Sequence, residues 1–437
     1  MTALGGAPMP EQPVAPSHAS EWRRGWPIIV TAMIGIGTGA ALYQYLASLF
    51  ITSLETTYGW SRGQVVTIGA LALVGAFSSP FMGRIADRYG IRPVAIVATL
   101  VIAIAYVGLA ASDGSMGQII PLMMLFGLAA PGTVGIVYSR AIASWFHTHR
   151  GMALGLMSSG ISLGALLLNA PVGWLIETHG FRAGSLALAG LALFVGLPVI
   201  WRGLRLDPEE GQRAAPNEAV AAIDTDPLSV ATAAQITPPL TTPILAIFAM
   251  PRFWLLVITM MLFNIPSAGI LTQLAPLLSG RGVTLAQGSA LFALFAGSVI
   301  AGRLLVGWLF DRYSPPHIAA VVTFAAAFGI LSFLDTAPLV TLIPGVIAVG
   351  LVQGSESDVV AYFIGRIFAP HSFSTVYGLT MTFTMTGTAI GVIGFGRLFD
   401  FYGDYDVPLM IGAGFFFLTS GLYLTLLRYF RSATPVE

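Results

Sequence analysis

The chain contains Gly83-Arg84-Ile85-Ala86-Asp87-Arg88-Tyr89 and, much later, the matching segment Gly307-Trp308-Leu309-Phe310-Asp311-Arg312-Tyr313. A second pair of segments matches in the same way. Gly173-Trp174-Leu175-Ile176-Glu177 has its counterpart in Gly396-Arg397-Leu398-Phe399-Asp400. The interval from Asp87 to Asp311 is nearly the same as the interval from Glu177 to Asp400. Two unrelated landmarks with nearly the same offset indicate that the chain consists of two homologous halves.

The composition predicts that these halves are membrane-embedded. Of the 437 residues, 56% are apolar and only 9% are charged, whereas soluble domains carry about 25% charged residues. Apolar runs of about 18 residues or more recur along the chain, and each is long enough to cross a hydrocarbon core of ~30 Å. The predicted fold is therefore an all-α membrane protein.

We predict twelve transmembrane helices in two pseudo-symmetric six-helix bundles. The predicted spans are Trp26–Ile51, Val65–Met82, Val94–Ala111, Ile119–Trp145, Met152–Ile176 and Gly184–Trp201, then Phe253–Leu278, Gly288–Phe310, Ile318–Leu334, Val340–Phe368, Thr375–Leu398 and Val407–Leu427. The corresponding domains are a disordered cytoplasmic tail (1–20), an N-terminal bundle (21–201), a polar cytoplasmic linker (202–242), a C-terminal bundle (243–430) and a second tail (431–437).

The arginines predict the orientation. With a cytoplasmic N-terminus and twelve spans, fourteen arginines lie on the cytoplasmic side, and only Arg62, Arg182, Arg281 and Arg397 lie on the outer side. Such an asymmetry is what the positive-inside rule predicts. We therefore expect a multi-pass protein of the inner (plasma) membrane with both termini in the cytoplasm.

Missing residue types exclude several function classes. The chain has no lysine, so it has no phosphate-binding loop ending in Gly-Lys-Ser/Thr and is no ATP-driven pump. It also has no cysteine, which removes disulfides, thiolate metal sites and cysteine nucleophiles. We expect no metal at His147 or His149, no cofactor, no nucleic-acid partner and no enzymatic activity.

The repeated segment also points to a family. Gly83 to Arg92 resembles the signature between helices 2 and 3 of the major facilitator superfamily, a superfamily of transporters, and it lies in the expected basic cytoplasmic loop. The resemblance implies a gating role, in which glycines allow close helix approach and charged side chains hold the two halves in one state. The gating residues predicted in this way are Gly83, Asp87, Arg88, Gly90 and Arg92, with Asp311 and Arg312 in the second copy.

A narrower resemblance concerns the monocarboxylate porter and oxalate/formate antiporter branch. It rests on Arg24-Gly25-Trp26, on His149 to Gly155, and on Gly302-Arg303 followed by Gly307. In that branch the arginine of helix 8 binds a substrate carboxylate, and the resemblance implies this role for Arg303. The chain departs from its relatives by having Val299 where an Asp often occurs. Some relatives also have a Lys in helix 1 or helix 11, and this chain has Gln44 at the corresponding helix 1 position.

An ionisable side chain within a membrane span costs about 2.5–3.5 kcal/mol on insertion scales and is a functional candidate. Four charged residues within the predicted spans stand out. Arg303 is either an anion-binding residue or the partner of an acid on helix 10. Glu356 and Asp358 are candidates for proton coupling, and Asp358 also for a structural role. Arg140 is either a second anion contact or the partner of Asp87.

Polar side chains at cavity-type positions complete the predicted substrate site. We select Tyr43 and Gln44 on helix 1 and Asn264 and Gln273 on helix 7. Each of them has the alternative role of a satisfied hydrogen bond between helices.

The predicted function is secondary active transport of a small organic anion, with a carboxylate as the expected substrate, by proton symport and alternating access. The partners are then the anion, protons and the lipid bilayer, with a monomer as the functional unit. The alternative is an exporter of a drug or metabolite by proton antiport, although helix 5 lacks the Gly-Pro pair that is frequent in such exporters. A membrane enzyme or a passive channel is disfavoured, because no nucleophile–base pair or charged ring is evident.

Overall fold

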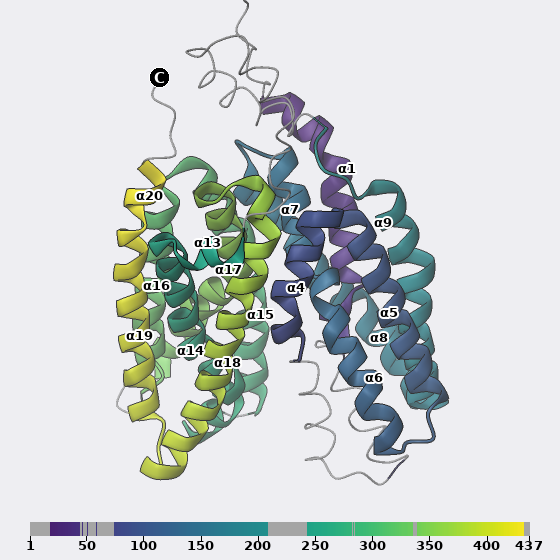
Figure 1. The fold of residues 1–437 in the computed structure, drawn as a ribbon. Coiled ribbons are helices and arrows are strands. Elements are labelled where there is room, and N and C mark those ends of the chain that lie inside the picture. Colours follow the sequence, from purple (N-terminus) through teal and green to yellow (C-terminus); the bar gives the residue numbers. More distant parts are fainter. Residues whose placement is uncertain are drawn as a thin grey trace, which may run out of the picture.

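The computed structural model describes residues 18–43, 46, 50, 58, 74–208, 243–281, 283, 285–334 and 339–431. Within these ranges all regular secondary structure is helical, and the helices form two bundles that lie side by side (Figure 1). Most of the predicted linker, both predicted tails and part of the first two predicted spans lie outside the described residues.

The first bundle contains the helices before residue 209. They are α1 (His18–Gly37), α4 (Val74–Tyr89), α5 (Ile91–Ala111), α6 (Met116–Ala129), the 3₁₀ turn η2 (Ala130–Thr133), α7 (Gly135–Trp145), α8 (Arg150–Gly190), the π-helical turn η3 (Leu191–Gly196) and α9 (Leu197–Gly203).

The second bundle contains the remaining helices. They are α13 (Ile244–Phe248), α14 (Pro251–Gly280), α15 (Leu285–Arg312), α16 (Pro315–Leu331), η4 (Leu339–Thr341), α17 (Leu342–Ile367), η5 (Pro370–Ser372), α18 (Phe373–Tyr402), α19 (Asp406–Thr425) and α20 (Leu427–Arg431).

Among the described residues, eight helical stretches are long and apolar enough to cross a membrane. One of them, Arg150–Gly203, runs for 54 residues, more than twice the roughly 20 that one span needs. Gly180 divides it, because its backbone has φ +79° and ψ 173°, outside the helical region. This position falls between the predicted spans Met152–Ile176 and Gly184–Trp201.

The predicted fourth span, in contrast, is broken in the middle. Pro131 is the second residue of a 3₁₀ turn, Ala130–Thr133, between α6 and α7. The helix breaks here because proline has no N–H to donate and its ring disrupts the preceding helical turn. The Thr133 hydroxyl beside this turn accepts a hydrogen bond of 3.1 Å from the backbone N–H of Ala40. The break therefore joins α7 to the segment that follows α1.

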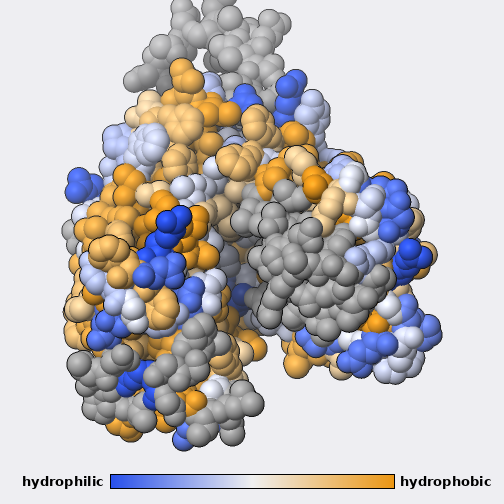
Figure 2. Space-filling model, turned by 90° about the horizontal axis from the view of Figure 1, so that it is seen from below, coloured by the Kyte–Doolittle hydropathy of each residue, from blue (hydrophilic) through white to orange (hydrophobic). Residues whose placement is uncertain are grey.

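Two helix pairs form most of the contact between the bundles, namely α4 with α18 and α8 with α15. The bundles meet near the face where α1 begins and α20 ends, which we call the chain-end face (Figure 1). Seen from the opposite side, the surface is hollowed between two lobes (Figure 2). The structure is thus closed at the chain-end face and hollow on the other side.

The first residues of the predicted linker are packed against the first bundle. Leu204 is buried, and the indole N–H of Trp145 donates a 3.0 Å hydrogen bond to the carbonyl of Arg205. The Arg205 guanidinium also lies 5.6 Å from the centre of the Trp145 ring. The charged linker sequence therefore starts as a segment fixed to the end of α7.

Candidate functional site

A cavity of about 300 Å³ lies between the two bundles. Helices α1, α4, α7 and α8 of the first bundle and α17 and α18 of the second contribute to its wall. Most of the lining is apolar. The polar side chains in the wall carry hydroxyl groups and come from Tyr43, Ser79, Ser139, Ser158, Ser357 and Tyr377.

Arg303 lies immediately behind this wall. The residue is only 7% exposed on α15, and its Nη1 donates a 2.5 Å hydrogen bond to the backbone carbonyl of Ser158 on α8. Its Nε is buried without a hydrogen-bond partner among the described residues. A buried charge whose donors are only partly used is costly, so this arginine is placed to take an additional acceptor.

Asp358 of α17 shares the same serine. The Ser158 hydroxyl donates a 2.5 Å hydrogen bond to Asp358 Oδ1, while Oδ2 is buried without a hydrogen-bond partner in the described part of the chain. Ser158 therefore connects an arginine and a carboxylate of the second bundle to helix α8 of the first. Because it also lines the cavity, it is the point where cavity, charges and bundle interface meet.

Glu356 and Asp358 directly precede and follow Ser357, the α17 residue that lines the cavity. The Oε2 of Glu356 accepts a 3.0 Å hydrogen bond from the side-chain amide of Gln353, one helical turn earlier. Glu356 is partly exposed, whereas Asp358 is buried. The two predicted coupling acids thus have different surroundings, and the one that contacts the other bundle is Asp358.

Arg140 does not reach the cavity wall in this structure. Its guanidinium forms an ion pair with Asp87, whose carboxylate is fully buried. Of the two roles that the sequence left open, the observed contact is the second. Asp87 consequently receives a fixed charge from its own bundle.

The predicted polar contacts of the cavity are distributed unevenly. Tyr43 lines the cavity. Asn264 is buried, donates to the Met260 carbonyl at 3.0 Å and accepts from the Thr388 hydroxyl at 3.2 Å. Gln273 accepts a 2.9 Å hydrogen bond from Tyr405. Asn264 and Gln273 thus bond within the second bundle, and Gln44 lies outside the described residues.

Asp87 also holds the second bundle. Its Oδ2 accepts hydrogen bonds from the backbone N–H and the hydroxyl of Thr375, at 2.7 and 2.6 Å, and its Oδ1 accepts from the Ser374 N–H at 3.1 Å. These donors are in the first turn of α18, where backbone N–H groups lack a partner within the helix. A carboxylate at this point is further stabilised by the helix dipole.

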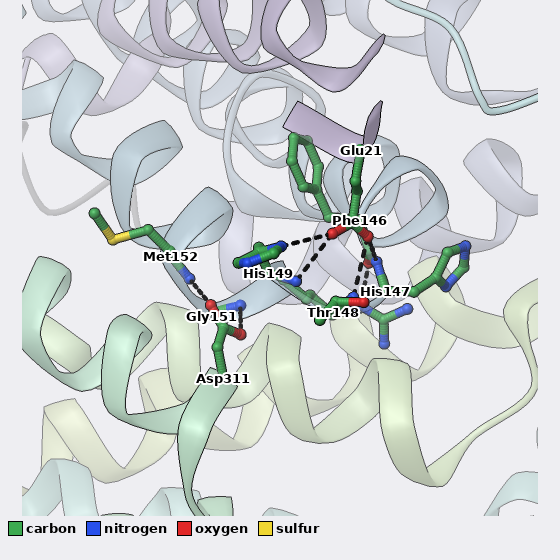
Figure 3. Close-up of polar contacts among 9 residues, drawn as sticks. Glu21, Phe146, His147, Thr148, His149, Gly151, Met152 and Asp311 are labelled. Atoms are coloured by element: carbon green, nitrogen blue, oxygen red, sulfur yellow. Dashed lines mark hydrogen bonds and ion pairs between the residues drawn. The ribbon is translucent and has the colours of Figure 1, made fainter. Parts of the chain in front are cut away.

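Asp311 makes the reciprocal contact. Its two oxygens accept hydrogen bonds of 2.7 and 2.8 Å from the N–H groups of Gly151 and Met152, in the first turn of α8 (Figure 3). Gly151 and Ser374 are separated in the sequence by nearly the same interval as Asp87 and Asp311. The two bundles therefore exchange the same kind of contact at the chain-end face.

Glu21 of α1 holds the same helix terminus from within the first bundle. Its carboxylate accepts hydrogen bonds from the backbone N–H groups of His147, Thr148 and His149, at 2.5, 3.0 and 3.3 Å, and lies 2.8 Å from His149 Nδ1. Figure 3 shows Glu21 and Asp311 on opposite sides of this segment. The start of α8 is thus bound by one carboxylate from each bundle.

Glycines permit the helix pairs to approach this closely. A Cβ atom added to Gly83 on α4 would lie 2.0 Å from the Ser374 carbonyl oxygen, and one on Gly378 of α18 would lie 2.2 Å from the Ser79 oxygen. On the other pair, a Cβ at Gly151 would lie 2.2 Å from the Gly307 oxygen. The repeated glycines are therefore places of backbone contact.

The remaining motif residues make contacts within their own bundle. Gly90 has φ +91°, which favours glycine, and it ends α4 before α5 begins. Arg92 donates to the Trp201 carbonyl. Arg88 lies 5.4 Å from the Tyr89 ring centre, and Arg312 lies 4.4 Å from that of Trp308.

Sequence reasoning missed Glu21, Ser158, Ser374 and Thr375. Ser374 and Thr375 could have been found by extending the repeat, because α18 begins one repeat interval after α8. Glu21 and Ser158 carry no comparable signal, since their partners are 126 and 200 residues away.

Comparison with known proteins decides the family. A model described as Major Facilitator Superfamily matches residues 28–392, more than half of the chain. The chain belongs to the major facilitator superfamily. Members of this superfamily carry small molecules across membranes and are not enzymes, so the predicted all-α transporter fold and the absence of an enzymatic role are confirmed.

Its relatives include proteins of the branch that the sequence resembles. Human monocarboxylate transporter 11 is 26% identical over 98% of this chain and 88% of its own. A gallate transporter of Pseudomonas putida is 26% identical, covering 91% of this chain and 89% of the relative. Among solved structures, the Escherichia coli fucose:proton symporter has a TM-score of 0.68 at 12% identity, covering 93% and 98% of the two chains. This likeness shows the superfamily fold.

Proposed function

We propose that this superfamily member is a secondary active transporter of a small organic anion, a carboxylate, which it carries together with protons by alternating access. The observation that carries the proposal is the position of Arg303. This arginine is buried in a membrane-spanning helix, directly behind the cavity wall, and is joined through Ser158 to the other bundle.

The chemistry of arginine supports an anionic substrate. A guanidinium presents a planar fork of donors that matches a carboxylate and stays charged at all physiological pH values. Arg303 uses Nη1 on a backbone carbonyl, and its Nε is buried without a hydrogen-bond partner in the described structure. A carboxylate that enters at Ser158 would complete the coordination of the guanidinium.

Coupling to protons would follow from competition for this arginine. Asp358 and Arg303 bind the hydroxyl and the carbonyl of the same residue, Ser158, and Glu356 lies two residues before Asp358 on α17. A substrate carboxylate that takes over the arginine leaves such an acid without its counter-charge, which favours protonation. We assign the stronger coupling role to Asp358, because its contact with Ser158 spans the two bundles.

The substrates that the relatives' names state, monocarboxylates and gallate, all carry a carboxylate and are consistent with this proposal. We place the protein in the inner membrane. The arginine distribution supports an orientation in which the chain-end face points to the cytoplasm. The hollow between the bundles would then open to the outside. One polypeptide contains both bundles, so we propose a monomer as the functional unit.

The test is uptake of radiolabelled mono- and dicarboxylates into proteoliposomes with an alkaline interior. Uptake by protein-free liposomes is subtracted, because neutral acids cross lipid unaided. Arg303→Gln, Glu356→Gln and Asp358→Asn are measured alongside the unmodified protein. We expect gradient-driven accumulation that Arg303→Gln abolishes, while Asp358→Asn retains exchange of carboxylate but loses accumulation.

Two results would contradict the proposal. Unchanged accumulation by a folded Arg303→Gln variant would make Arg303 a structural residue. Absence of any carboxylate flux, together with proton-driven extrusion of a neutral or cationic compound, would favour an exporter.

A further inference from the structure

Most of the described side chains that line the cavity are apolar. On α18, Tyr377, Met381 and Met385 follow one another at intervals of four residues and all three line the cavity. Such spacing places side chains on one face of a helix. Met157 and Ile161 of α8, which are also four residues apart, line the cavity as well.

Four of the hydroxyl side chains in the described wall, those of Ser139, Ser158, Ser357 and Tyr377, gather beside Arg303 and Asp358. Ser158 contacts Arg303 and Asp358. Ser357 is the neighbour of Asp358 in the chain, and the Tyr377 hydroxyl is bonded to Ser139 and interacts with the charge of Asp358. The other hydroxyl side chains of the described wall are Tyr43 and Ser79, and the Ser79 hydroxyl donates to the Gly75 carbonyl of its own helix at 2.8 Å. The rest of the described lining is apolar, so it forms an apolar body next to a charged and hydroxylated region.

From this division we infer that the preferred substrate is a monocarboxylate whose body is apolar, aromatic or branched aliphatic, and that the three methionines Met157, Met381 and Met385 select it. The inference rests on the proposed function, because it requires the carboxylate to bind at the Arg303 end. It adds which carboxylates are taken and which are rejected.

The selection has a direct physical cause. A hydroxyl or a second charge on the substrate body would face thioethers and aliphatic carbons, and so would lose its water without gaining a hydrogen bond. Thioethers are polarisable and flexible, pack well against aromatic rings and adapt to bodies of different shape. The wall therefore tolerates variation in apolar shape and excludes polar substituents.

The experiment uses isothermal titration calorimetry on the purified full-length protein in detergent, which avoids the passive leak of weak acids through lipid. Two nearly isosteric pairs are compared. Isobutyrate and lactate differ by a methyl in place of a hydroxyl, and benzoate and nicotinate differ by a ring C–H in place of a ring nitrogen. We expect the apolar member of each pair to bind about 10- to 100-fold more tightly, and succinate to show no binding.

Substitution of the wall tests the methionines directly. Met381→Gln keeps the side-chain shape and adds an amide, and we expect it to reduce the benzoate-to-nicotinate ratio to about threefold or less. Met381→Leu stays apolar and is the matched control, which should retain the ratio. Thermal unfolding of each variant establishes that it is folded.

The outcomes separate the two proposals. If lactate binds as tightly as isobutyrate, or if Met381→Gln leaves both ratios unchanged, the inference about the apolar body is overturned while carboxylate transport stands. If none of these carboxylates binds the folded protein, the proposed function itself fails.

Discussion

Asp87 and Asp311, the matching aspartates of the two halves, each accept two backbone N–H bonds from the first turn of a helix in the opposite bundle. Asp87 is paired with Arg140 within its own bundle. Asp311 instead faces a helix terminus that Glu21 also binds. The contact of Asp87 is therefore reinforced by a fixed positive charge, whereas Asp311 shares its helix terminus with a second carboxylate whose negative charge opposes its own.

Removing either carboxylate charge should weaken the closed chain-end face. Each aspartate makes charge-assisted hydrogen bonds of about 1.5–3 kcal/mol, so Asp87→Asn or Asp311→Asn should shift the balance toward opening by roughly tenfold or more. The effect of Asp87→Asn should be the larger one, because it also leaves Arg140 without its counter-ion. The chain has no cysteine, so opening can be followed by placing a single cysteine, Ser139→Cys, in the cavity wall and labelling it with an impermeant maleimide applied to the chain-end face. The same labelling rate with and without the aspartate substitution would contradict the assignment.

A methyl group at a helix crossing should prevent closure. Gly378→Ala would place a Cβ about 2.2 Å from the Ser79 carbonyl oxygen, and backbone must move to accept it. We expect faster Ser139→Cys labelling from the chain-end face and transport reduced at least tenfold. Gly394→Ala on the same helix is the control, since no atom of the described residues lies within 4 Å of its added Cβ. Similar behaviour of the two variants would show that the crossing is looser than the structure indicates.

Loss of the Ser158 hydroxyl should affect transport without unfolding the protein. Ser158→Ala leaves Asp358 without the hydrogen bond that joins it to α8, and we expect the transport rate to fall about tenfold. Ser159→Ala is the matched control, because within the described part of the chain the Ser159 hydroxyl donates to the Gly155 carbonyl of its own helix, at 2.8 Å, and to no residue of the other bundle. Initial rates in proteoliposomes at equal reconstitution check this. A control that loses as much activity as Ser158→Ala would refute the special role of Ser158.

Glu21 should make stability depend on acidic pH. Burial by itself raises the pKa of Glu21, but hydrogen bonds from the His147 and Thr148 N–H groups and from His149 outweigh it and hold the pKa below the ordinary 4.5. Because the pKa of Glu21 is lower in the folded than in the unfolded protein, its carboxylate contributes fully to the free energy of unfolding above about pH 4.5. This contribution is lost as the pH falls through the pKa of the folded state.

Glu21→Gln should therefore unfold at a lower temperature than the parent at pH 7, and the difference should shrink below pH 4.5. The loss at neutral pH is about 1.5–3 kcal/mol, the range for hydrogen bonds to a charged group. Thermal unfolding in detergent between pH 4 and 7 measures it. A constant difference over this range would mean that the carboxylate charge is not what stabilises the α8 terminus.

The helical fold was predictable because its signals are local or periodic. Apolar length defined the spans, and the repeat of Gly83 to Tyr89 defined the two halves. The break at Pro131 was marked only by one proline within an apolar run, and prolines also occur inside α4 and α6 without dividing them. Helix breaks of this kind depend on what packs beside them, as the Ala40 contact with Thr133 shows.

The candidate site was predictable in its charges but not in its contacts. Intramembrane arginines and acids are conspicuous because they are expensive, which is how Arg303, Arg140, Glu356 and Asp358 were selected. Which of them meet is decided by helix rotation and by partners far away in the chain. Ser158, an ordinary serine among small residues, therefore could not be distinguished from its neighbour Ser159.

The reciprocal contacts of Asp87 and Asp311 have the form of an isologous dimer interface, in which residue i of one protomer meets j of the other, and j meets i. Each six-helix half thus carries both parts of a self-complementary surface. Halves produced as two separate polypeptides should be able to find each other without the linker. The same surface would also let either half, produced alone, pair with a second copy of itself. Covalent linkage in one chain favours the productive pair of one N-terminal and one C-terminal half over these two unproductive homodimers.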